Sequence, residues 1–139
     1  MKSYLASNLD ELDSVAKQIL KDYNNISIFA LKGDLGAGKT ALVKAFAKCL
    51  AISDNVSSPT FSLINEYGNP TSVYHFDLYR LETQKEIVQI GFEDYIDSNK
   101  YCFIEWPEKI TMLLPPDRSK MISIVMQSND IRKLTIEDL

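Results

Sequence analysis

Residues 33–40 of the chain carry the spacing of a phosphate-binding loop. They read GDLGAGKT, which fits the pattern G-x-x-x-x-G-K-[ST] of nucleoside triphosphatases, and they hold three of the five glycines in the sequence. Glycine suits such a loop because backbone N–H groups must turn inward around an anion, and side chains would block its approach. Lys39 offers a positive charge to the β- and γ-phosphates of a nucleotide, and the hydroxyl of Thr40 offers a ligand to Mg²⁺.

The sequences on either side of the loop support this interpretation. Residues 26–31 form a short apolar run rich in strand formers, and residues 41–50 have the composition and spacing of a helix. Strand, loop and helix in this order are the setting of a phosphate-binding loop, whereas a plain glycine-rich turn with a surface lysine needs no such setting. The N-terminus of the following helix also favours an anion. The predicted nucleotide contacts are Gly33, Asp34, Leu35, Gly36, Ala37, Gly38, Lys39, Thr40 and Ala41.

The composition is that of an ordinary globular protein. The length of 139 residues suits one domain over residues 1–139, and the net charge of −4 argues against a strong grip of its own on nucleic acid. No apolar run approaches the roughly 20 residues of a membrane span, and polar residues interrupt the N-terminus too early for a secretory signal. Cys49 and Cys102 are isolated from each other, which predicts two buried thiols. Together these features favour a cytoplasmic protein with no membrane partner.

The hydrophobic pattern predicts an α/β fold of the P-loop NTPase-like kind, with three layers in which helices flank a mixed central sheet. A hairpin over residues 60–77 follows the loop helix directly, and this departure from a plain βαβ repeat favours a mixed sheet over an all-parallel one. Ser7 and Asp10 resemble a capping box at the first helix, and Thr83 and Glu86 resemble another. The expected strands cover residues 1–6, 26–31, 60–67, 72–77, 101–104, 121–126 and 133–136, and the expected helices begin near Ser7, Ala41, Thr83, Phe92 and Lys109.

Two acidic residues close apolar runs of the sequence. Asp77 follows residues 73–76, and Glu105 follows residues 101–104, which we expect to form a central buried strand. Catalytic groups beside a phosphate-binding loop project from the carboxyl ends of neighbouring strands, so either acid is a candidate for the metal ligand that nucleotide hydrolysis requires. An acid at a strand end is, taken alone, more often a solvated loop residue, so the assignment depends on the phosphate-binding loop.

The segment before the expected hairpin is a second candidate for contact with the nucleotide. Hydroxyls of Ser58 and Thr60 stand where a switch loop could sense the γ-phosphate or its Mg²⁺, although an ordinary turn around Pro59 accounts for the same residues equally well. The single histidine, His75, is expected to pack within a strand. The single tryptophan, Trp106, is expected to pack in the core or at its rim.

Four segments of the sequence occur in an order that resembles one family. They are GDLGAGKT at residues 33–40, SPTF at 58–61, HFDLYR at 75–80 and EWPE at 105–108. The first segment is common to many nucleotide-binding families, whereas the other three together are highly specific. The chain closely resembles the bacterial TsaE family over nearly its whole length, and none of these positions departs from the family pattern.

The resemblance implies a fold, an activity and a set of partners. TsaE-like proteins are small mixed α/β ATPases that bind ATP and Mg²⁺ and act with the TsaB–TsaD pair, which transfers a threonylcarbamoyl group to adenosine 37 of tRNA. The resemblance implies that ATP hydrolysis resets that machinery, and contact with tRNA is expected only through the complex. The family pattern implies that Thr40 and Glu105 bind Mg²⁺ and that Asp77 is needed for hydrolysis. From the residues themselves we expect Asp77 to orient the attacking water or a metal-bound water, and Lys39 to neutralise charge on the phosphates. Hydrolysis is expected to be slow in the isolated chain and faster in the complex, and Asn8 is a candidate neighbour of the adenine.

Three other functions stay open at this point. A small-molecule kinase uses the same loop, but it usually needs a basic lid over the phosphates, and the sequence has only three widely spaced arginines. A GTP-dependent switch commonly carries Asn-Lys-x-Asp, whereas Asn99 and Lys100 here lead into Tyr101 and Cys102. The third alternative is an interaction subunit that binds nucleotide without significant hydrolysis.

Overall fold

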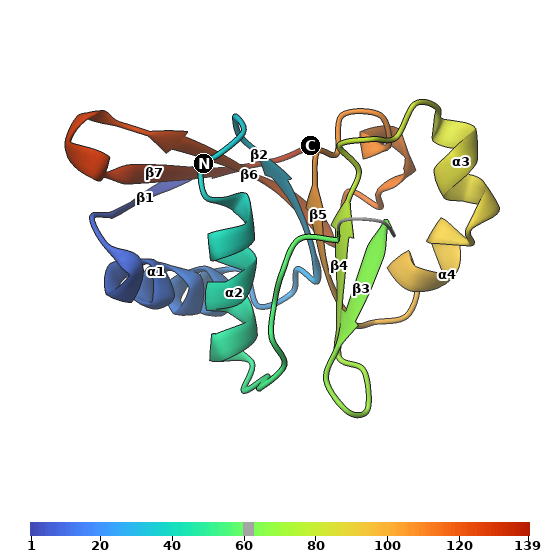
Figure 1. The fold of residues 1–139 in the computed structure, drawn as a ribbon, viewed down its shortest axis with the longest axis horizontal. Helices are drawn as coiled ribbons and strands as arrows, with labels where there is room; N and C mark the ends of the chain where they lie inside the picture. The colour runs from blue at the N-terminus through green and yellow to red at the C-terminus, as the bar shows by residue number, and fades with distance from the viewer. Residues whose placement is uncertain (60–62) are drawn as a thin grey trace.

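A computed structural model of the chain describes residues 1–59 and 63–139, and its centre is a mixed sheet (Figure 1). Within the described residues seven strands pair in the order β1-β7-β6-β2-β5-β4-β3. β6, β2, β5 and β4 run parallel to one another, whereas β1, β7 and β3 run antiparallel to their neighbours. The strands are β1 (Lys2–Ala6), β2 (Ile28–Lys32), β3 (Ile64–Tyr67), β4 (Val73–Asp77), β5 (Tyr101–Glu105), β6 (Ser119–Met126) and β7 (Arg132–Glu137).

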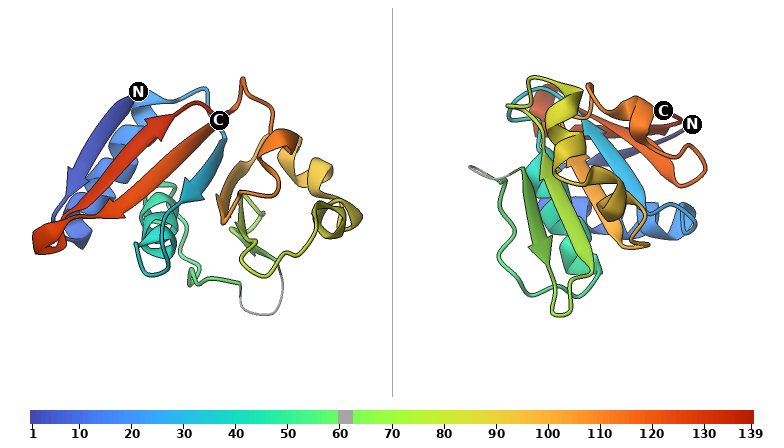
Figure 2. Two further views of the ribbon diagram at one scale, coloured as in Figure 1. Left: turned by 90° about the horizontal axis from the view of Figure 1, so that it is seen from above. Right: turned by 90° about the vertical axis from the view of Figure 1, so that its right-hand side faces the viewer.

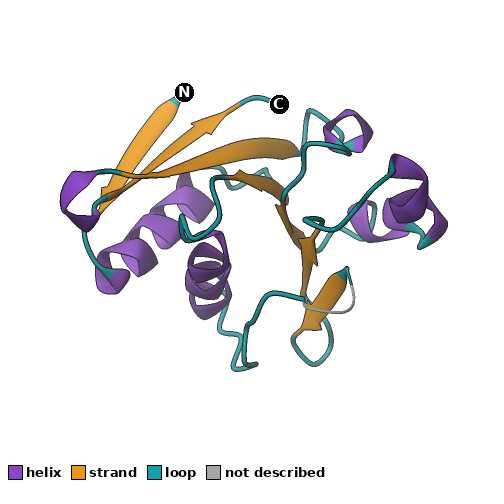
Figure 3. Ribbon diagram, turned by 45° about the horizontal axis from the view of Figure 1, so that its top comes forward, coloured by secondary structure: helices purple, strands orange, loops and turns teal. Residues whose placement is uncertain are grey.

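Helices lie on both faces of this sheet, which confirms the predicted α/β fold with a mixed sheet. The helices are α1 (Leu9–Asp22), α2 (Lys39–Cys49), α3 (Gln84–Gln89) and α4 (Phe92–Ile96), with short 3₁₀ turns η1 (Thr111–Leu113) and η2 (Ser128–Asp130). Figures 1 and 3 show α1 and α2 together against one part of the sheet, and α3 and α4 beyond β4 and β5. Strands β1 and β7, from the two ends of the chain, pair side by side at one edge (Figure 2).

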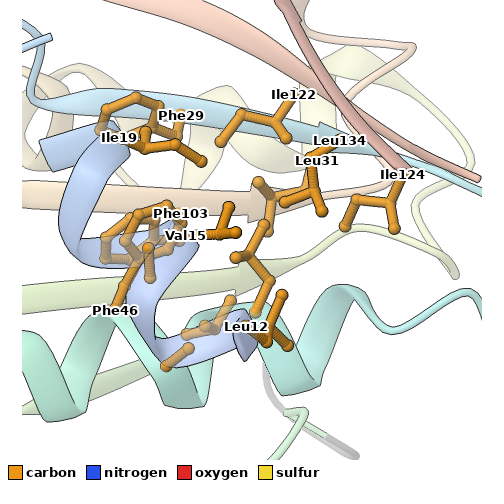
Figure 4. Close-up of a cluster of buried hydrophobic side chains, with 14 of the residues drawn as sticks. Leu12, Val15, Ile19, Phe29, Leu31, Phe46, Phe103, Ile122, Ile124 and Leu134 are labelled. Atoms are coloured by element: carbon orange, nitrogen blue, oxygen red, sulfur yellow. The ribbon is translucent and has the colours of Figure 1, made fainter. Parts of the chain in front are cut away.

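Strand β2 shows why the sheet is buried on both faces. Phe29 and Leu31 point toward α1 and α2, where the rings of Phe29, Phe46 and Phe103 stack with centroids 4.7–5.9 Å apart (Figure 4). Ile28 and Ala30 point the other way, into a second core under α3 and α4. Because successive side chains of a strand alternate between faces, a central parallel strand must be apolar at every position, as the continuous apolar run in the sequence indicates.

The first helix is capped one residue later than predicted. Asn8 is the N-cap, and its Oδ1 accepts a hydrogen bond of 2.8 Å from the N–H of Glu11. The carboxylate of Glu11 reaches back to the N–H of Ser7 at 2.9 Å. The predicted box of Ser7 and Asp10 was therefore wrong, because the residue with the longer acidic side chain reaches back over the turn while the amide of Asn8 caps it. The predicted box of Thr83 and Glu86 at α3 is confirmed.

Most other expected elements are confirmed with small shifts of their ends. α2 begins at Lys39, two residues before the predicted start, because the loop turns directly into the helix at Gly38. The expected strand over residues 60–67 is seen from Ile64, and residues 60–62 lie outside the described part of the chain. Cys102 is buried as predicted, but Cys49 is exposed at the C-terminal end of α2, so the prediction of two buried thiols was wrong. None of the helices in the described residues is long and apolar enough to cross a membrane.

Candidate nucleotide and metal site

The predicted site residues meet at the carboxyl edge of three parallel strands. β2 leads into the loop of residues 33–38, and the register of β4 and β5 places Asp77 beside Glu105. A pocket of about 310 Å³ lies at this edge. It is lined by Leu35, Gly36, Gly38, Lys39, Thr40, Ala41, Ser58, Asp77, Glu105 and Trp106. The other predicted contacts, Gly33, Asp34 and Ala37, line an adjoining pocket of about 470 Å³ that shares Leu35, Gly36 and Trp106 with the first.

The loop has the backbone that its glycines predict. Gly36 and Gly38 have φ of +82° and +108°, in a region that side chains disfavour. A Cβ at Gly33 would lie 2.9 Å from the carbonyl oxygen of Ile124, so this glycine allows the close approach of the loop to β6. All three glycines of the motif are therefore needed by the geometry of the loop itself.

Lys39 is held inside the loop by contacts with the backbone. Its Nζ donates to the carbonyl oxygens of Gly33 at 2.5 Å and Asp34 at 3.1 Å, and it lies 3.9 Å from the centroid of the Trp106 ring. Burial lowers the pKa of Lys39, while the acids around it, Glu105 foremost, oppose that shift. An ammonium has three donors, so two bonds to the loop leave one for an anion in the pocket.

Trp106 has a backbone conformation that is unusual for its side chain. Its φ is +56°, in the left-handed region, and its ring contacts both Lys39 and Tyr79; the centroids of the Trp106 and Tyr79 rings lie 4.9 Å apart. Left-handed backbone at a bulky residue is costly and concentrates at functional sites. The sequence predicted only packing for Trp106, whereas the structure brings it to the wall of the pocket.

Glu105 is buried with polar partners on both sides. Its side chain is 4 % exposed, and the hydroxyl of Thr40 donates to its two carboxylate oxygens at 3.0 and 3.2 Å. On its other side, His75 Nε2 lies 2.5 Å from Glu105 Oε2. A hydroxyl and a carboxylate oxygen that face each other are hard ligands of the kind that Mg²⁺ prefers.

This donor set fits a nucleotide-bound Mg²⁺ better than a metal held by protein alone. The described residues contain no group of three or more His, Cys, Asp or Glu side chains that could hold a metal ion. Mg²⁺ commonly takes only one or two protein ligands, because waters and substrate phosphates complete its shell. Thr40 and Glu105 therefore suffice for the site that the loop implies.

Asp77 lies next to this pair and is tied to the preceding loop. One carboxylate oxygen accepts a hydrogen bond from the hydroxyl of Ser58, and the other accepts from the N–H of Tyr79 at 3.1 Å. Ser58 lines the pocket, and its role as a sensor of the γ-phosphate stays a prediction, while Thr60 lies outside the described residues. Asn8 caps α1 through its side chain, and its role beside the adenine stays a prediction.

Arg132 is a residue of this region that the sequence did not indicate. It begins β7, and its Nε lies 2.7 Å from the place that a Cβ on Gly38 would take. That Nε is buried and has no hydrogen-bond partner among the described residues. Arg132 lies 94 positions after Gly38 along the chain, so no local pattern in the sequence links the two. The structure thus adds a cation to the side of the loop that faces β7.

Comparisons with known proteins show which family the chain resembles. The family described as threonylcarbamoyl adenosine biosynthesis protein TsaE matches residues 6–134. A tRNA threonylcarbamoyladenosine biosynthesis protein TsaE of Bacillus subtilis is 36% identical over 129 residues, which cover 92% of this chain and 80% of that protein. The protein of the same name from Haemophilus influenzae is 36% identical over 126 residues, covering 82% and 80%. The crystal structure of Bacillus subtilis YdiB is similar with a TM-score of 0.71 and 27% identity, over 97% of this chain and 83% of that one.

The resemblance that the four segments indicate is confirmed by these matches. The match of the family covers the phosphate-binding loop and both acidic strand ends within residues 6–134. The chain therefore belongs to the TsaE family.

Proposed function

We propose that the chain is a Mg²⁺-dependent ATPase that serves the threonylcarbamoylation of adenosine 37 in tRNA and resets the TsaB–TsaD transferase complex. The observation that carries the proposal is the convergence of Lys39, Thr40, Asp77 and Glu105 on one pocket beside the loop. The name of its relatives, which places them in tRNA threonylcarbamoyladenosine biosynthesis, supports the assignment to this modification.

The loop and Lys39 bind the phosphates in this proposal. Backbone N–H groups of the loop and of the start of α2 offer donors to phosphate oxygens, and the helix N-terminus favours their charge. Lys39 is held by two carbonyl oxygens, so it is already oriented before nucleotide binds. Preorganised charge of this kind stabilises the transition state of phosphoryl transfer more than flexible groups do.

Thr40 and Glu105 hold the Mg²⁺ in this proposal. Their oxygen atoms lie 3.0–3.2 Å apart, so both can reach one small cation, and ATP is the ligand that would bring it. When bound, the ion neutralises charge that develops on the phosphate oxygens. Glu105 is almost fully buried, and a buried carboxylate is stabilised by a cation beside it.

Asp77 orients the attacking water. It is half-buried at the pocket wall, and the bonds from Ser58 and from the N–H of Tyr79 fix its carboxylate. A fixed acceptor beside the phosphate site can hold a water molecule in line with the γ-phosphate. The products are then ADP and inorganic phosphate, with no phosphorylated small molecule.

The partners follow from the family and from the charge of the chain. With a net charge of −4 the chain is not suited to hold tRNA by itself, so contact with tRNA comes through the TsaB–TsaD complex. That role implies the cytoplasm as the place of action.

Nucleotide titration and product analysis test the proposal together. Trp106 is the only tryptophan and lines the pocket, so its fluorescence should report binding. We expect ATP to bind more tightly than GTP, Mg²⁺ to strengthen ATP binding, and inorganic phosphate to appear without a phosphorylated acceptor. Equal or stronger GTP binding would favour a GTP-dependent switch, and a phosphorylated small molecule would favour a kinase.

A further inference from the structure

His75 is a buried polar residue that the proposed chemistry does not use. It is the only histidine of the chain, its side chain is fully buried, and it lies in the middle of β4. Burial of a polar side chain costs folding free energy unless the side chain forms hydrogen bonds in the protein interior. The partners of His75 therefore indicate what the residue does.

The register of three neighbouring strands sets His75 between two polar side chains. On β5, Glu105 lies two residues beyond Phe103, the partner of His75. On β3, Tyr67 lies two residues beyond Asn65, the partner of His75 on that side. Because side chains two residues apart share a face, Tyr67, His75 and Glu105 form one row across the sheet.

Hydrogen bonds join the members of this row. His75 Nε2 lies 2.5 Å from Glu105 Oε2, and the ring nitrogen donates there because a carboxylate offers only acceptors. His75 Nδ1 lies 3.1 Å from the hydroxyl oxygen of Tyr67, a residue that is 4 % exposed. The row is therefore buried. Hydrogen bonds in the protein interior are stronger than in water, and losing one there costs more.

The row ends on the loop that also holds Asp77. The Tyr67 hydroxyl oxygen lies 2.9 Å from the carbonyl oxygen of Ser57, to which the side-chain amide of Asn65 also donates at 2.9 Å. The next residue, Ser58, donates through its hydroxyl to Asp77. One chain of contacts therefore joins Glu105 to the segment of Ser57 and Ser58, and that segment to the second acid of the site.

We infer that His75 is a positioning residue, which with Tyr67 fixes the Glu105 carboxylate toward Thr40 and links it to the Ser57–Ser58 segment. The inference rests on the proposed function, which gives Glu105 its role as metal ligand. A glutamate has three rotatable side-chain bonds, so a ligand that must meet a small cation gains from a partner that holds its second oxygen. Loss of such a partner typically lowers metal affinity by about 10–100-fold.

The test measures the Mg²⁺ dependence of nucleotide binding, with ADP as the probe and Trp106 fluorescence as the signal. Each protein is titrated with ADP in EDTA and with ADP at increasing Mg²⁺. His75→Leu should lower the apparent Mg²⁺ affinity by about 10-fold or more and leave ADP affinity in EDTA unchanged. His75→Gln, whose amide can still donate to Glu105, should recover part of the loss.

Two further tyrosine variants extend this test, one within the row and one outside it as the matched control. Tyr67→Phe removes only the hydroxyl and should lower Mg²⁺ affinity in the same direction by a smaller factor. Tyr74→Phe also removes a hydroxyl, from the residue next to His75 in β4. The ring of Tyr74 packs against Tyr95 on the opposite face of the sheet, with centroids 4.8 Å apart, so this variant should leave Mg²⁺ affinity unchanged. Thermal unfolding of each variant shows which proteins are folded at the assay temperature.

The outcomes separate this inference from the proposed function. Wild-type protein that binds ADP equally with and without Mg²⁺ would overturn the metal role of Glu105, and the inference with it. Wild-type protein that needs Mg²⁺, together with an unchanged Mg²⁺ affinity in folded His75→Leu and Tyr67→Phe, would overturn the inference alone. An equal loss of ADP affinity in EDTA and in Mg²⁺ for folded His75→Leu would also overturn it, since that pattern means general damage to the pocket.

Discussion

Replacement of Gly38 by alanine is expected to cost more stability than replacement of Gly36, although both glycines have left-handed backbones. φ is +108° at Gly38 and +82° at Gly36, and a Cβ in this region costs about 1–2 kcal/mol at either position. At Gly38 the added Cβ would also lie 2.7 Å from Nε and 3.3 Å from Cδ of Arg132. At Gly36 none of the described atoms lies within 4 Å of it.

The overlap sets the size of the difference between the two variants. Forcing an extra carbon into a filled space costs about 1–3 kcal/mol, and the flexible side chain of Arg132 can shift, which keeps this cost near its low end. Gly38→Ala should therefore lose about 2–3 kcal/mol of unfolding free energy and Gly36→Ala about 1–2 kcal/mol. Urea-induced unfolding gives both values from the midpoint and the slope of the transition.

A second substitution separates backbone strain from the overlap. Arg132→Ala in the Gly38→Ala background removes the atoms that the new Cβ meets. The double variant should therefore regain the part of the unfolding free energy that the overlap with Arg132 had cost. Equal losses in the two glycine variants, or no recovery in the double variant, would refute the reasoning that Gly38 is required by the approach of Arg132.

Three further predictions concern Asp77, a surface carboxylate and the thiols. Asp77→Asn should keep nucleotide binding and lower ATP turnover in the TsaB–TsaD complex by about 100-fold or more, and wild-type turnover in that variant would remove Asp77 from its role. The hydroxyl of Tyr4 donates to Asp22 at 2.6 Å and holds the pKa of that carboxyl below its usual range. A carboxyl whose pKa is lowered by folding stabilises the protein at pH values where the unfolded carboxyl is ionised. Asp22→Asn should therefore lower the free energy of unfolding in urea at pH 7, and the difference from wild type should vanish as the pH falls well below about 4. A difference that stays constant with pH would contradict this. Burial raises the pKa of the Cys102 thiol to about 12, while Cys49 is exposed, so a thiol reagent should titrate one thiol in native protein and two in denaturant.

The sequence was most informative where local pattern and chemistry coincide. The glycines and Lys39 identify the loop by spacing alone, since this backbone needs those residue types wherever it occurs. Asp77 and Glu105 were identifiable because parallel strands bring their carboxyl ends to one edge, whatever the order of the strands. The mixed sheet was predictable from a hairpin that follows the loop helix directly.

Contacts that depend on strand order and register could not be predicted. His75 becomes the partner of Glu105 only because β4 lies next to β5, and Arg132 reaches Gly38 only because β7 returns to the same side of the sheet. The left-handed backbone of Trp106 leaves no mark on a sequence pattern either, because that region is not typical of tryptophan. The cap of α1 was misplaced since Ser7 and Asn8 are both good caps, and only the reach of Glu11 decides between them.

ATP turnover by the purified chain, measured as inorganic phosphate with and without TsaB–TsaD and tRNA, tests the central claim most directly. We expect slow release from the chain alone, a marked increase with the complex, and loss of that increase in Asp77→Asn. Phosphate release that is absent in every mixture, or that persists unchanged in Asp77→Asn, would contradict the claim that this pocket hydrolyses ATP for the complex.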